Sequence, residues 1–547
     1  MKQTLFFIFL SKIFSKVFFF FLFSGFYFSN TYAQQTNLPL GYSFNQLIDK
    51  EISQKTNFSS FKPLIKTSVN LNIDSIVEKK FSGNNNFLSH KLFNRHWILI
   101  EGDDYKIEAS PLLNLSLGYE NIEEINTFTN TRGFVLEGYI GGKVSFYTSF
   151  VENQSTFPNY LDSIIRTPTH DYVIPGQGRG RTYYDNGFDY AKSSGYLSFK
   201  ASDYFTLQFG HGKHFIGNGY RSLLLSDNSF NYPFLRLQTS FGKFQYTNLY
   251  AEFQDLKNYL SSDNNYDYMG YAKKYMSAHH LSYKLSEKFN IGIFESIIWK
   301  SNHTLGANGF DINYLNPIIF FRPVESSINS PDNAIIGLDL KYNLTTRSNL
   351  YAQLIFDEFT LNQLKSDDGY WANKYGYQIG YKYYDLFNIS NLTLHLERNY
   401  VRPYTYSHWN NANYGHYNEE LAHPLGANFS ENILILHYRK DRLDMQVKYL
   451  NIIYGSDYIG DTISYGNNIY ADYNNRSSDF GIEMYNGNKT NVDYTQINIG
   501  YILNPSTNLK IDFSLVSRKL SSEVHNYNTL FYSISLKSDL FNHYYDF

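Results

Sequence analysis

Hydrophobic and polar residues alternate along much of the chain from about residue 105 to its end. One face of an extended segment carries Leu509, Ile511, Phe513 and Leu515, and the other carries Lys510, Asp512 and Ser514. Similar alternation runs from Leu338 to Leu344 and from Leu392 to Leu396. Because successive side chains of a β-strand point to opposite faces, this pattern predicts strands with one apolar and one polar face.

The connections between these segments alternate between short turns and longer polar loops. The short turns lie at Gly141–Gly142, Ala201–Asp203, Gly242, Ser286–Glu287, Thr345–Ser348, Asp385–Ser390, Lys440–Asp441 and Asn504–Thr507. In a soluble β-sandwich, short turns and long loops do not alternate so consistently along the chain. With an opening strand near Tyr105–Tyr119 and a closing strand near Thr529–Leu540, we expect an even total of about 18 strands. The sequence therefore predicts an all-β fold, a closed antiparallel transmembrane β-barrel over residues 101–547.

Aromatic residues support a barrel in a membrane. The chain has 52 tyrosines and 46 phenylalanines, and aromatic residues make up 19% of it. Such rings favour the two membrane interfaces, where the apolar body meets lipid and the polar edge meets the headgroups. Leu530, Tyr532, Ile534 and Leu536 form the apolar row of the last strand. The final residue is Phe547, an aromatic terminus of the kind commonly seen where outer-membrane barrels are recognised for assembly.

The first 33 residues have the features of a signal peptide. Lys2 precedes a strongly apolar stretch that Lys12 and Lys16 interrupt, and small residues lead to Ala33. We expect cleavage between Ala33 and Gln34 and export to the outer membrane. The alternative is an uncleaved signal anchor.

Residues 34–100 are expected to form a small periplasmic helical segment. Ser43 and Gln46 have capping-box spacing, and the residues Phe44, Leu47, Ile48 and Ile52 share one helical face. A weaker helical pattern runs from Asp74 to Lys80. This segment either packs beneath the barrel or serves as a plug or partner-docking element, and the sequence does not choose between them.

Charge and composition exclude several classes of protein. The 47 basic and 50 acidic residues give a net charge of -3, so nothing favours a nucleic-acid partner. The absence of cysteine excludes disulfides, zinc–thiolate sites and cysteine nucleophiles. A mean hydropathy of -0.40 excludes a polytopic helical membrane protein.

Three segments carry a resemblance to a known family. They are FGHGKHFIGNGYRSLLLSDNS at 209–229, YLNPIIFFRPVESSINSPDN at 314–333 and VRPYTYSHWNNANYGHYNEELAHPLGANF at 401–429. Together they resemble the gliding motility protein RemB family of Bacteroidota outer membranes and, more distantly, the Wzi-like capsule assembly barrels. The resemblance covers most of the mature chain. It implies an 18-stranded barrel with a small periplasmic helical element, and a role in surface gliding or in retention of surface polysaccharide.

The first of these segments is rich in glycine. It lacks the helix and the Lys-Ser/Thr ending of a phosphate-binding loop, so we interpret its glycines as bends at the barrel rim. We expect Gly217, Gly219, Arg221 and Asp227 to anchor the loop inward, with ligand contact as the alternative.

Histidines and carboxylates do not form a convincing catalytic or metal pattern. His211, His214, His279 and His280 have no carboxylate at ligand-like spacing, and we expect no metal and no cofactor. His395 and Glu397 share one strand face, where a satisfied polar network is a better interpretation than an acid/base pair. We expect no catalytic residues.

The segment from Arg402 to Asn428 is the best candidate for ligand recognition. The candidate ligand-binding residues are Arg402, Tyr404, Tyr406, His408, Trp409, Tyr414, His416, Tyr417 and His423. Aromatic faces stack on sugar rings, while Asn, His and Arg bind hydroxyl and acidic groups. The alternative is a self-packed loop that closes the pore, which Pro403 and Pro424 favour. A basic loop that contains Arg166, Arg179 and Arg181 is interpreted as a solvated loop rather than a site for acidic polysaccharide.

These observations favour a non-enzymatic outer-membrane barrel of the cell surface. Its expected partners are outer-membrane lipid and either surface polysaccharide or gliding machinery, bound through the extracellular loops. The alternative is a transport channel or porin, and a barrel enzyme that acts on lipid or glycan is a third hypothesis.

Overall fold

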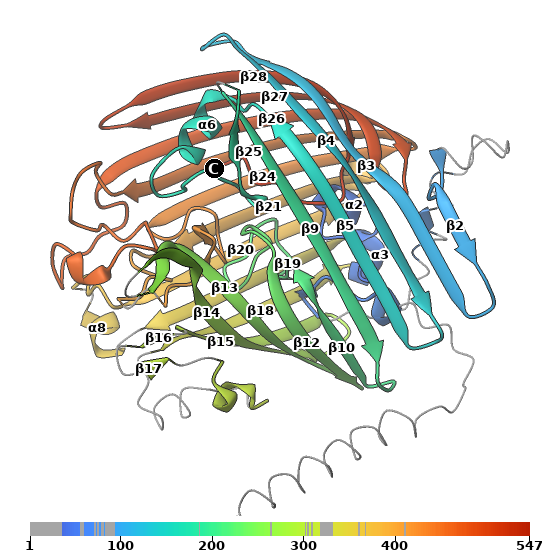
Figure 1. Ribbon diagram of the computed structural model, residues 1–547, viewed down its shortest axis with the longest axis horizontal. Coiled ribbons are helices and arrows are strands. Elements are labelled where there is room, and N and C mark those ends of the chain that lie inside the picture. Colours follow the sequence, from blue (N-terminus) through green and yellow to red (C-terminus); the bar gives the residue numbers. More distant parts are fainter. Residues whose placement is uncertain are drawn as a thin grey trace, which may run out of the picture.

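The computed structural model shows a closed barrel of long, tilted strands (Figure 1). The structure describes residues 35–54, 59–69, 73, 76–77, 81, 93–184, 186–262, 265–300, 302–303, 306–307, 310–317, 332–358, 361–366, 368–409 and 412–547. The expected signal peptide and most of the second predicted helix lie outside these residues. Among the described residues, no helix has both the length and the apolar character needed to cross a membrane.

Within the described residues, 18 antiparallel strands form the barrel wall. They are β3 (Tyr105–Glu120), β4 (Ile125–Ile140), β5 (Val144–Ser155), β9 (Gly187–Lys200), β10 (Phe205–Gly212), β12 (Tyr232–Phe241), β13 (Phe244–Ser262), β14 (Asn265–Lys284), β15 (Phe289–Lys300), β18 (Asn333–Thr345), β19 (Ser348–Glu358), β20 (Lys374–Tyr384), β21 (Leu392–Val401), β24 (Phe429–Lys440), β25 (Leu443–Ser456), β26 (Asn488–Asn504), β27 (Leu509–Ser522) and β28 (Asn526–Ser538). Each pairs with its neighbour along the chain, and β28 closes the barrel on β3, with Ile534 opposite Leu117. The predicted fold class and strand number are confirmed.

Each predicted short turn joins two neighbouring wall strands at one end of the barrel, which we call the turn end. Gly141 and Gly242, for example, adopt positive φ angles of 58° and 55° in two of these turns. The longer connections gather at the opposite end, the loop end. Two short strands add to the wall: β2 (Ile98–Glu101) pairs with β3, and β8 (Arg181–Tyr183) pairs with β9.

The alternation in sequence separates the two faces of the wall. Leu117, Phe209 and Ile534 point outward and are 68%, 63% and 57% exposed, as lipid-facing side chains of an isolated barrel must be. On the inner face of β27, Lys510 and Asp512 are buried. The polar face of each strand therefore points into the lumen. Because the barrel is closed, no strand edge with unpaired backbone groups is exposed to lipid.

Residues 35–54 and 59–69 of the N-terminal segment lie inside the barrel at the turn end, whereas β2 joins the wall. These residues contain α2 (Tyr42–Asn45), α3 (Asp49–Gln54), β1 (Phe61–Lys62) and η1 (Lys66–Val69). The Asp49 carboxylate accepts hydrogen bonds from Lys382 at 2.8 Å and from the Tyr384 hydroxyl at 2.9 Å, both on the inner face of β20. This geometry corresponds to the plug interpretation.

The expected capping box at Ser43 is wrong. Helix α2 begins one residue earlier, with Gly41 as its N-cap and without a side-chain cap. The Ser43 hydroxyl instead contacts Asp444 of the wall at 3.4 Å, because the lumen offers polar partners that a free helix lacks. Phe44, Leu47 and Ile48 are buried in one apolar cluster, as their common helical face predicts.

The loop end carries the remaining short elements. They are α6 (Asn159–Ile165), β6 (Val173–Ile174), β7 (Gly178–Arg179), β11 (Phe215–Ile216), β16 (Asn302–His303), β17 (Gly306–Ala307), η2 (Ile312–Leu315), α8 (Leu361–Ser366), β22 (Gly415–His416), β23 (Glu419–Glu420) and η4 (Tyr473–Asn475), while η3 (Leu386–Asn388) lies in a turn at the opposite end. The loop of residues 213–231 descends deepest, and its β11 pairs with β1 of the N-terminal segment. A loop from one end of the barrel thus meets a segment from the other.

The C-terminal residues leave the wall after the last strand. Strand β28 ends at Ser538 at the turn end, and residues 539–547, here called the C-terminal tail, run back into the lumen, so that the chain ends inside the barrel (Figure 1). The tail combines apolar and aromatic side chains with charged and polar ones, and Asp546 is only 1% exposed. Its charge and hydroxyl groups find partners in the lumen that lipid cannot supply.

Candidate functional site

Arg221 lies at the centre of a buried polar network in the lumen. Its guanidinium contacts the Glu431 carboxylate at 3.1 Å and the Asp546 carboxylate at 2.9 Å. Its backbone N–H donates to Glu397 at 3.1 Å. Lys448 adds a second cation, 2.5 Å from Asp546. The network joins the loop of residues 213–231, strands β21, β24 and β25, and the C-terminal tail.

The other predicted anchors lie along the same loop. The Asp227 carboxylate accepts hydrogen bonds from the Tyr544 hydroxyl and the Asn542 amide, both at 2.8 Å, so it also holds the C-terminal tail. Gly217 has a φ of +144°, and a side chain there would lie 2.6 Å from Nε2 of Gln353. A side chain at Gly219 would overlap the Glu397 carboxylate. All four residues face protein atoms inside the barrel.

Most of the candidate ligand-binding residues are buried where the loop of residues 402–428 folds into the lumen. Tyr406 donates to the Leu223 carbonyl at 2.8 Å, Tyr414 to the Leu224 carbonyl at 2.6 Å, and Tyr404 to the Ser464 carbonyl at 2.8 Å. These tyrosines bind the protein itself in this conformation.

Two histidines of this loop also make polar contacts with other protein groups. His416 accepts a hydrogen bond from the Gln254 amide at 3.0 Å, and His423 contacts Glu431 at 2.7 Å. His408 is also buried, and Arg402 and Tyr417 are half-buried. Trp409 differs, with 46% of its surface exposed. Of the nine candidates, Trp409 is therefore the one that a surface ligand reaches most readily.

Trp409 borders a group of aromatic rings from three loops, here called the aromatic surface and defined by Tyr370, Trp371, Trp409, Tyr473 and Phe480. The Trp371 and Tyr473 rings lie 4.7 Å apart, and those of Tyr370 and Phe480 lie 5.3 Å apart. Phe480 is 47% exposed. The loops that carry these rings lie together at the loop end (Figure 1).

Two cations stack on these rings. The Arg476 guanidinium lies 4.1 Å from the centre of the Trp371 ring, and the Lys374 ammonium lies 4.3 Å from that of Tyr473. Such cation–π contacts fix the orientation of the rings. Lys374 is buried and pairs with Glu358, and Arg476 pairs with Asp479, so both charges are already balanced. The flat apolar faces of the exposed rings are suited to stacking on sugar rings.

Burial shifts the protonation of two groups in the loop of residues 402–428. It lowers the pKa of His416 to about 3, so this imidazole is neutral and fixed by its hydrogen bonds. It raises the pKa of Glu419 to about 8, although the Gly176 and Phe230 amides both donate to this carboxyl. His416 and Glu419 therefore contribute to the packing of the loop, and their side chains do not exchange protons readily with solvent.

The other histidines and carboxylates singled out in the sequence contact neighbouring protein groups. His395 contacts the Tyr42 hydroxyl at 2.9 Å, and Glu397 accepts from the Tyr220 amide at 2.8 Å. His214 and His280 contact the Phe61 ring, whereas His211 lies against Phe230 and His279 against Tyr246. In the basic loop, Arg166 pairs with Asp162 and Arg179 with Asp171.

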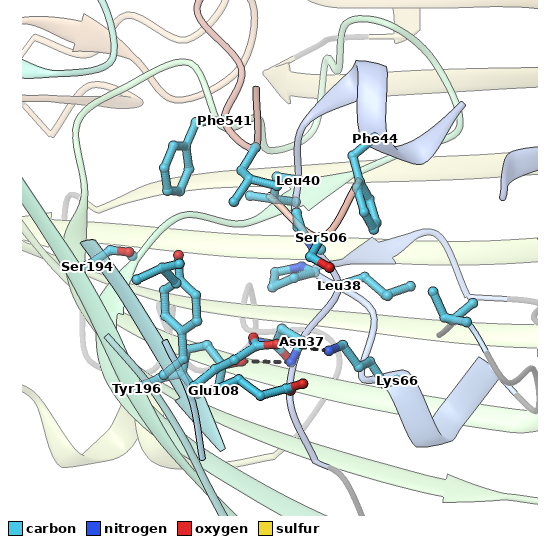
Figure 2. Close-up of a pocket in the computed structure, with 18 of the residues that line it drawn as sticks. Asn37, Leu38, Leu40, Phe44, Lys66, Glu108, Ser194, Tyr196, Ser506 and Phe541 are labelled. Atoms are coloured by element: carbon cyan, nitrogen blue, oxygen red, sulfur yellow. Dashed lines mark hydrogen bonds and ion pairs between the residues drawn. The ribbon is translucent and has the colours of Figure 1, made fainter. Parts of the chain in front are cut away.

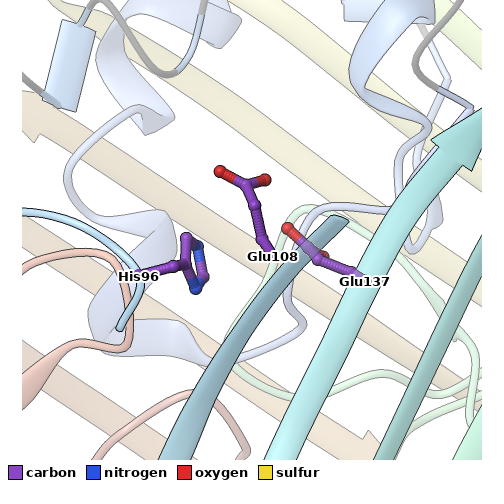
Figure 3. Close-up of side chains that lie close together, drawn as sticks. All are labelled: His96, Glu108 and Glu137. Carbon is purple, nitrogen blue, oxygen red and sulfur yellow. The ribbon is translucent and has the colours of Figure 1, made fainter. Parts of the chain in front are cut away.

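One group of possible metal ligands was missed by the sequence analysis. His96, Glu108 and Glu137 each place a ligand atom within 4.8 Å of the others, and Figure 3 shows the three side chains around a common space. Glu108 and Glu137 become neighbours only through the register of β3 and β4. Lys106 lies 2.8 Å from Glu108 and Lys66 lies 3.1 Å from Glu137, so lysines already balance the carboxylates.

The sequence analysis also missed Glu431, Lys448 and Asp546. Each belongs to a segment with no local motif, and they meet only because the wall closes and the C-terminal tail turns inward.

These features define the class of protein: a closed barrel with a lipid-facing outer surface and a lumen into which the N-terminal segment, two loops and the C-terminal tail extend. This is the architecture of outer-membrane barrels, in which short turns face the periplasm and longer loops face outward. The turn end is accordingly periplasmic and the loop end extracellular.

Comparison with known proteins supports this fold. Neither the family models nor the curated proteins gave a match. Among solved structures, the chain is similar to Wzi of Escherichia coli, a carbohydrate-binding β-barrel of the outer membrane involved in group 1 capsule assembly, with a TM-score of 0.51, 11% identity, and coverage of 92% of this chain and 99% of that chain. OprD of Pseudomonas aeruginosa has a TM-score of 0.40 and 12% identity over 78% of this chain and 94% of that chain. At these identities the similarity to Wzi defines the fold alone.

Proposed function

We propose that this chain is a non-enzymatic barrel of the cell surface that binds polysaccharide through its extracellular loops. The observation that carries the proposal is the aromatic surface, where the Trp409 and Phe480 side chains are exposed. Cation–π contacts from Arg476 and Lys374 hold the Trp371 and Tyr473 rings of the same surface, so it is organised before a ligand arrives. The carbohydrate binding described for Wzi is in keeping with this function.

Polysaccharide binding is tested with purified surface glycan of the producing organism and the full-length protein in detergent. We expect Trp409→Ala and Phe480→Ala each to weaken binding about two- to tenfold, since ring stacking contributes about 0.5–1.5 kcal/mol. Phe387→Ala is the matched control, because that ring is 80% exposed in a turn at the periplasmic end. Equal binding by all variants contradicts the proposal. Tyr414 is unsuitable for this test, because its burial makes substitution a test of loop folding.

The physiological role is either retention of polysaccharide or surface gliding. The gliding role is supported by the resemblance of three segments to RemB proteins. Deletion of the gene, followed by measurement of colony spreading and of retained capsule in one strain, separates the two. Loss of spreading with normal capsule favours motility, and loss of capsule favours a Wzi-like role.

A transport channel is the second candidate, favoured by the polar inner wall and by a cavity of about 370 Å³ within the lumen. The segments that enter the lumen, and the ion pairs that hold them there, argue against an open channel. Single-channel conductance in planar bilayers distinguishes the two candidates. Large, stable conductance steps from the full-length protein would favour the channel.

A further inference from the structure

The luminal cavity lies at the periplasmic end, apart from the aromatic surface. Figure 2 shows its lining, which combines the N-terminal segment, the barrel wall and the C-terminal tail. Ser506, in the turn between β26 and β27, marks its periplasmic side. Its volume of about 370 Å³ lies within the range of small-molecule sites.

Much of the cavity wall is apolar. Leu38, Phe44, Val135 and Leu540 belong to one buried hydrophobic cluster and also line the cavity. The rings of Tyr147 and Tyr196 stack 5.4 Å apart on the neighbouring strands β5 and β9. Such a wall favours a ligand with an apolar body.

Lys192 places a cation in this wall. It lies on the inner face of β9 and is 6% exposed, and its ammonium lies 4.4 Å from the centre of the Phe541 ring. Among the described residues, no acceptor lies within hydrogen-bond distance of this ammonium and no carboxylate within ion-pair distance. The Phe541 ring offsets part of the cost of burying this ammonium, and an anion bound to it would offset more.

The charged groups near Lys192 do not supply an anionic partner for its ammonium. Lys213, which also lines the cavity, donates to the Gly176 and Asp227 carbonyls. The Asp227 carboxylate is occupied by Tyr544 and Asn542. The Lys192 ammonium is therefore available to pair with an anion that enters the cavity.

We propose that the cavity binds a small carboxylate with an apolar body. Its anionic group pairs with the Lys192 ammonium, and its body lies against Leu38, Phe44 and Phe541. This site is separate from the polysaccharide surface and faces the other compartment.

Isothermal titration of the full-length protein in nonionic detergent tests the site with 3-phenylpropanoate and its uncharged amide. A charge-assisted contact at a buried site predicts that the acid binds at least about tenfold more tightly than the amide. Lys192→Met removes this preference, and Lys192→Arg retains it. Lys243→Met, at an exposed periplasmic turn outside the cavity, leaves binding unchanged.

Equal affinity for acid and amide overturns the proposal, as does undiminished binding of the acid by a folded Lys192→Met variant. Inorganic phosphate that competes as well as the acid would show a simple anion site and also overturns it. Heat-modifiable migration in electrophoresis verifies that each variant is folded. If Lys192→Met does not fold, the comparison of acid with amide on the wild-type protein and on Lys192→Arg decides.

Discussion

Arg221 and Asp546 form an ion pair of 2.9 Å inside the barrel, although 325 residues separate them in sequence. Arg221 comes from an extracellular loop that folds inward, and Asp546 comes from a tail that enters from the periplasmic end. The pair therefore couples the two ends of the lumen. Because both side chains are almost fully buried, their charges depend on each other.

Substitution of Arg221 by Met is expected to destabilise the barrel by about 3–5 kcal/mol, because the buried Glu431 and Asp546 carboxylates would lose the guanidinium that they share. Lys448 would remain paired with Asp546. Adding Asp546→Asn to this variant removes one of those charges, so the double variant is expected to lose less than the sum of the single losses. Thermal unfolding followed by heat-modifiable migration measures these differences.

Arg347→Met serves as the control for this cycle, because Arg347 is exposed in a periplasmic turn and its guanidinium donates a hydrogen bond to Asn388 there. Its effect should stay within about 0.5 kcal/mol. Strict additivity of Arg221→Met and Asp546→Asn would show that the two residues are not energetically coupled.

The ion pairs of Asp546 in the C-terminal tail predict that the stability of the fold depends on pH. Burial alone would raise the pKa of Asp546, but Arg221 and Lys448 more than offset burial and hold it below the ordinary value of 3.8. A carboxyl with a depressed folded pKa stabilises the fold above its unfolded pKa and loses that contribution as the pH falls through the folded value. The stability difference between wild type and Asp546→Asn is therefore constant above about pH 5 and shrinks toward pH 2. A difference that does not change over this range contradicts the prediction.

Gly217→Ala tests the path of the loop of residues 213–231. A φ of +144° combined with a contact of 2.6 Å to Gln353 predicts a loss of about 1–3 kcal/mol. Gly212→Ala is the control, because the nearest atom to its new carbon is 3.5 Å away, on Phe234. Susceptibility of the loop to added protease reports the result, and equal protection of both variants would disprove the strain.

The position of Phe547 predicts its behaviour in assembly. Because β28 ends at Ser538, Phe547→Ala should insert into the outer membrane as wild type does. Ile534→Lys, on the lipid face of β28 and 57% exposed, should impair insertion, since a cation near the membrane midplane costs about 2–4 kcal/mol. Failure of Phe547→Ala alone would restore the terminal aromatic residue as the assembly signal.

The amino-acid sequence by itself determined the wall of this protein. The period-two alternation of Ile511 and Phe513 with Lys510 and Asp512, together with the short turns, defined the strands, their number and the closed barrel. This succeeded because strand periodicity and turn chemistry are local, and because lipid on one side and a polar lumen on the other impose a strict pattern.

Only the tertiary structure decided what fills the lumen. Arg221 was identified as an inward anchor from sequence, but its partners Glu431, Lys448 and Asp546 were not, because they meet only when distant segments converge. The same convergence buried Tyr406 and Tyr414, left Trp409 at the surface and placed Lys192 beside a cavity. Pairing between segments far apart in the chain depends on barrel register and on complementary charge in a confined space, and neither is written in a local pattern of residues.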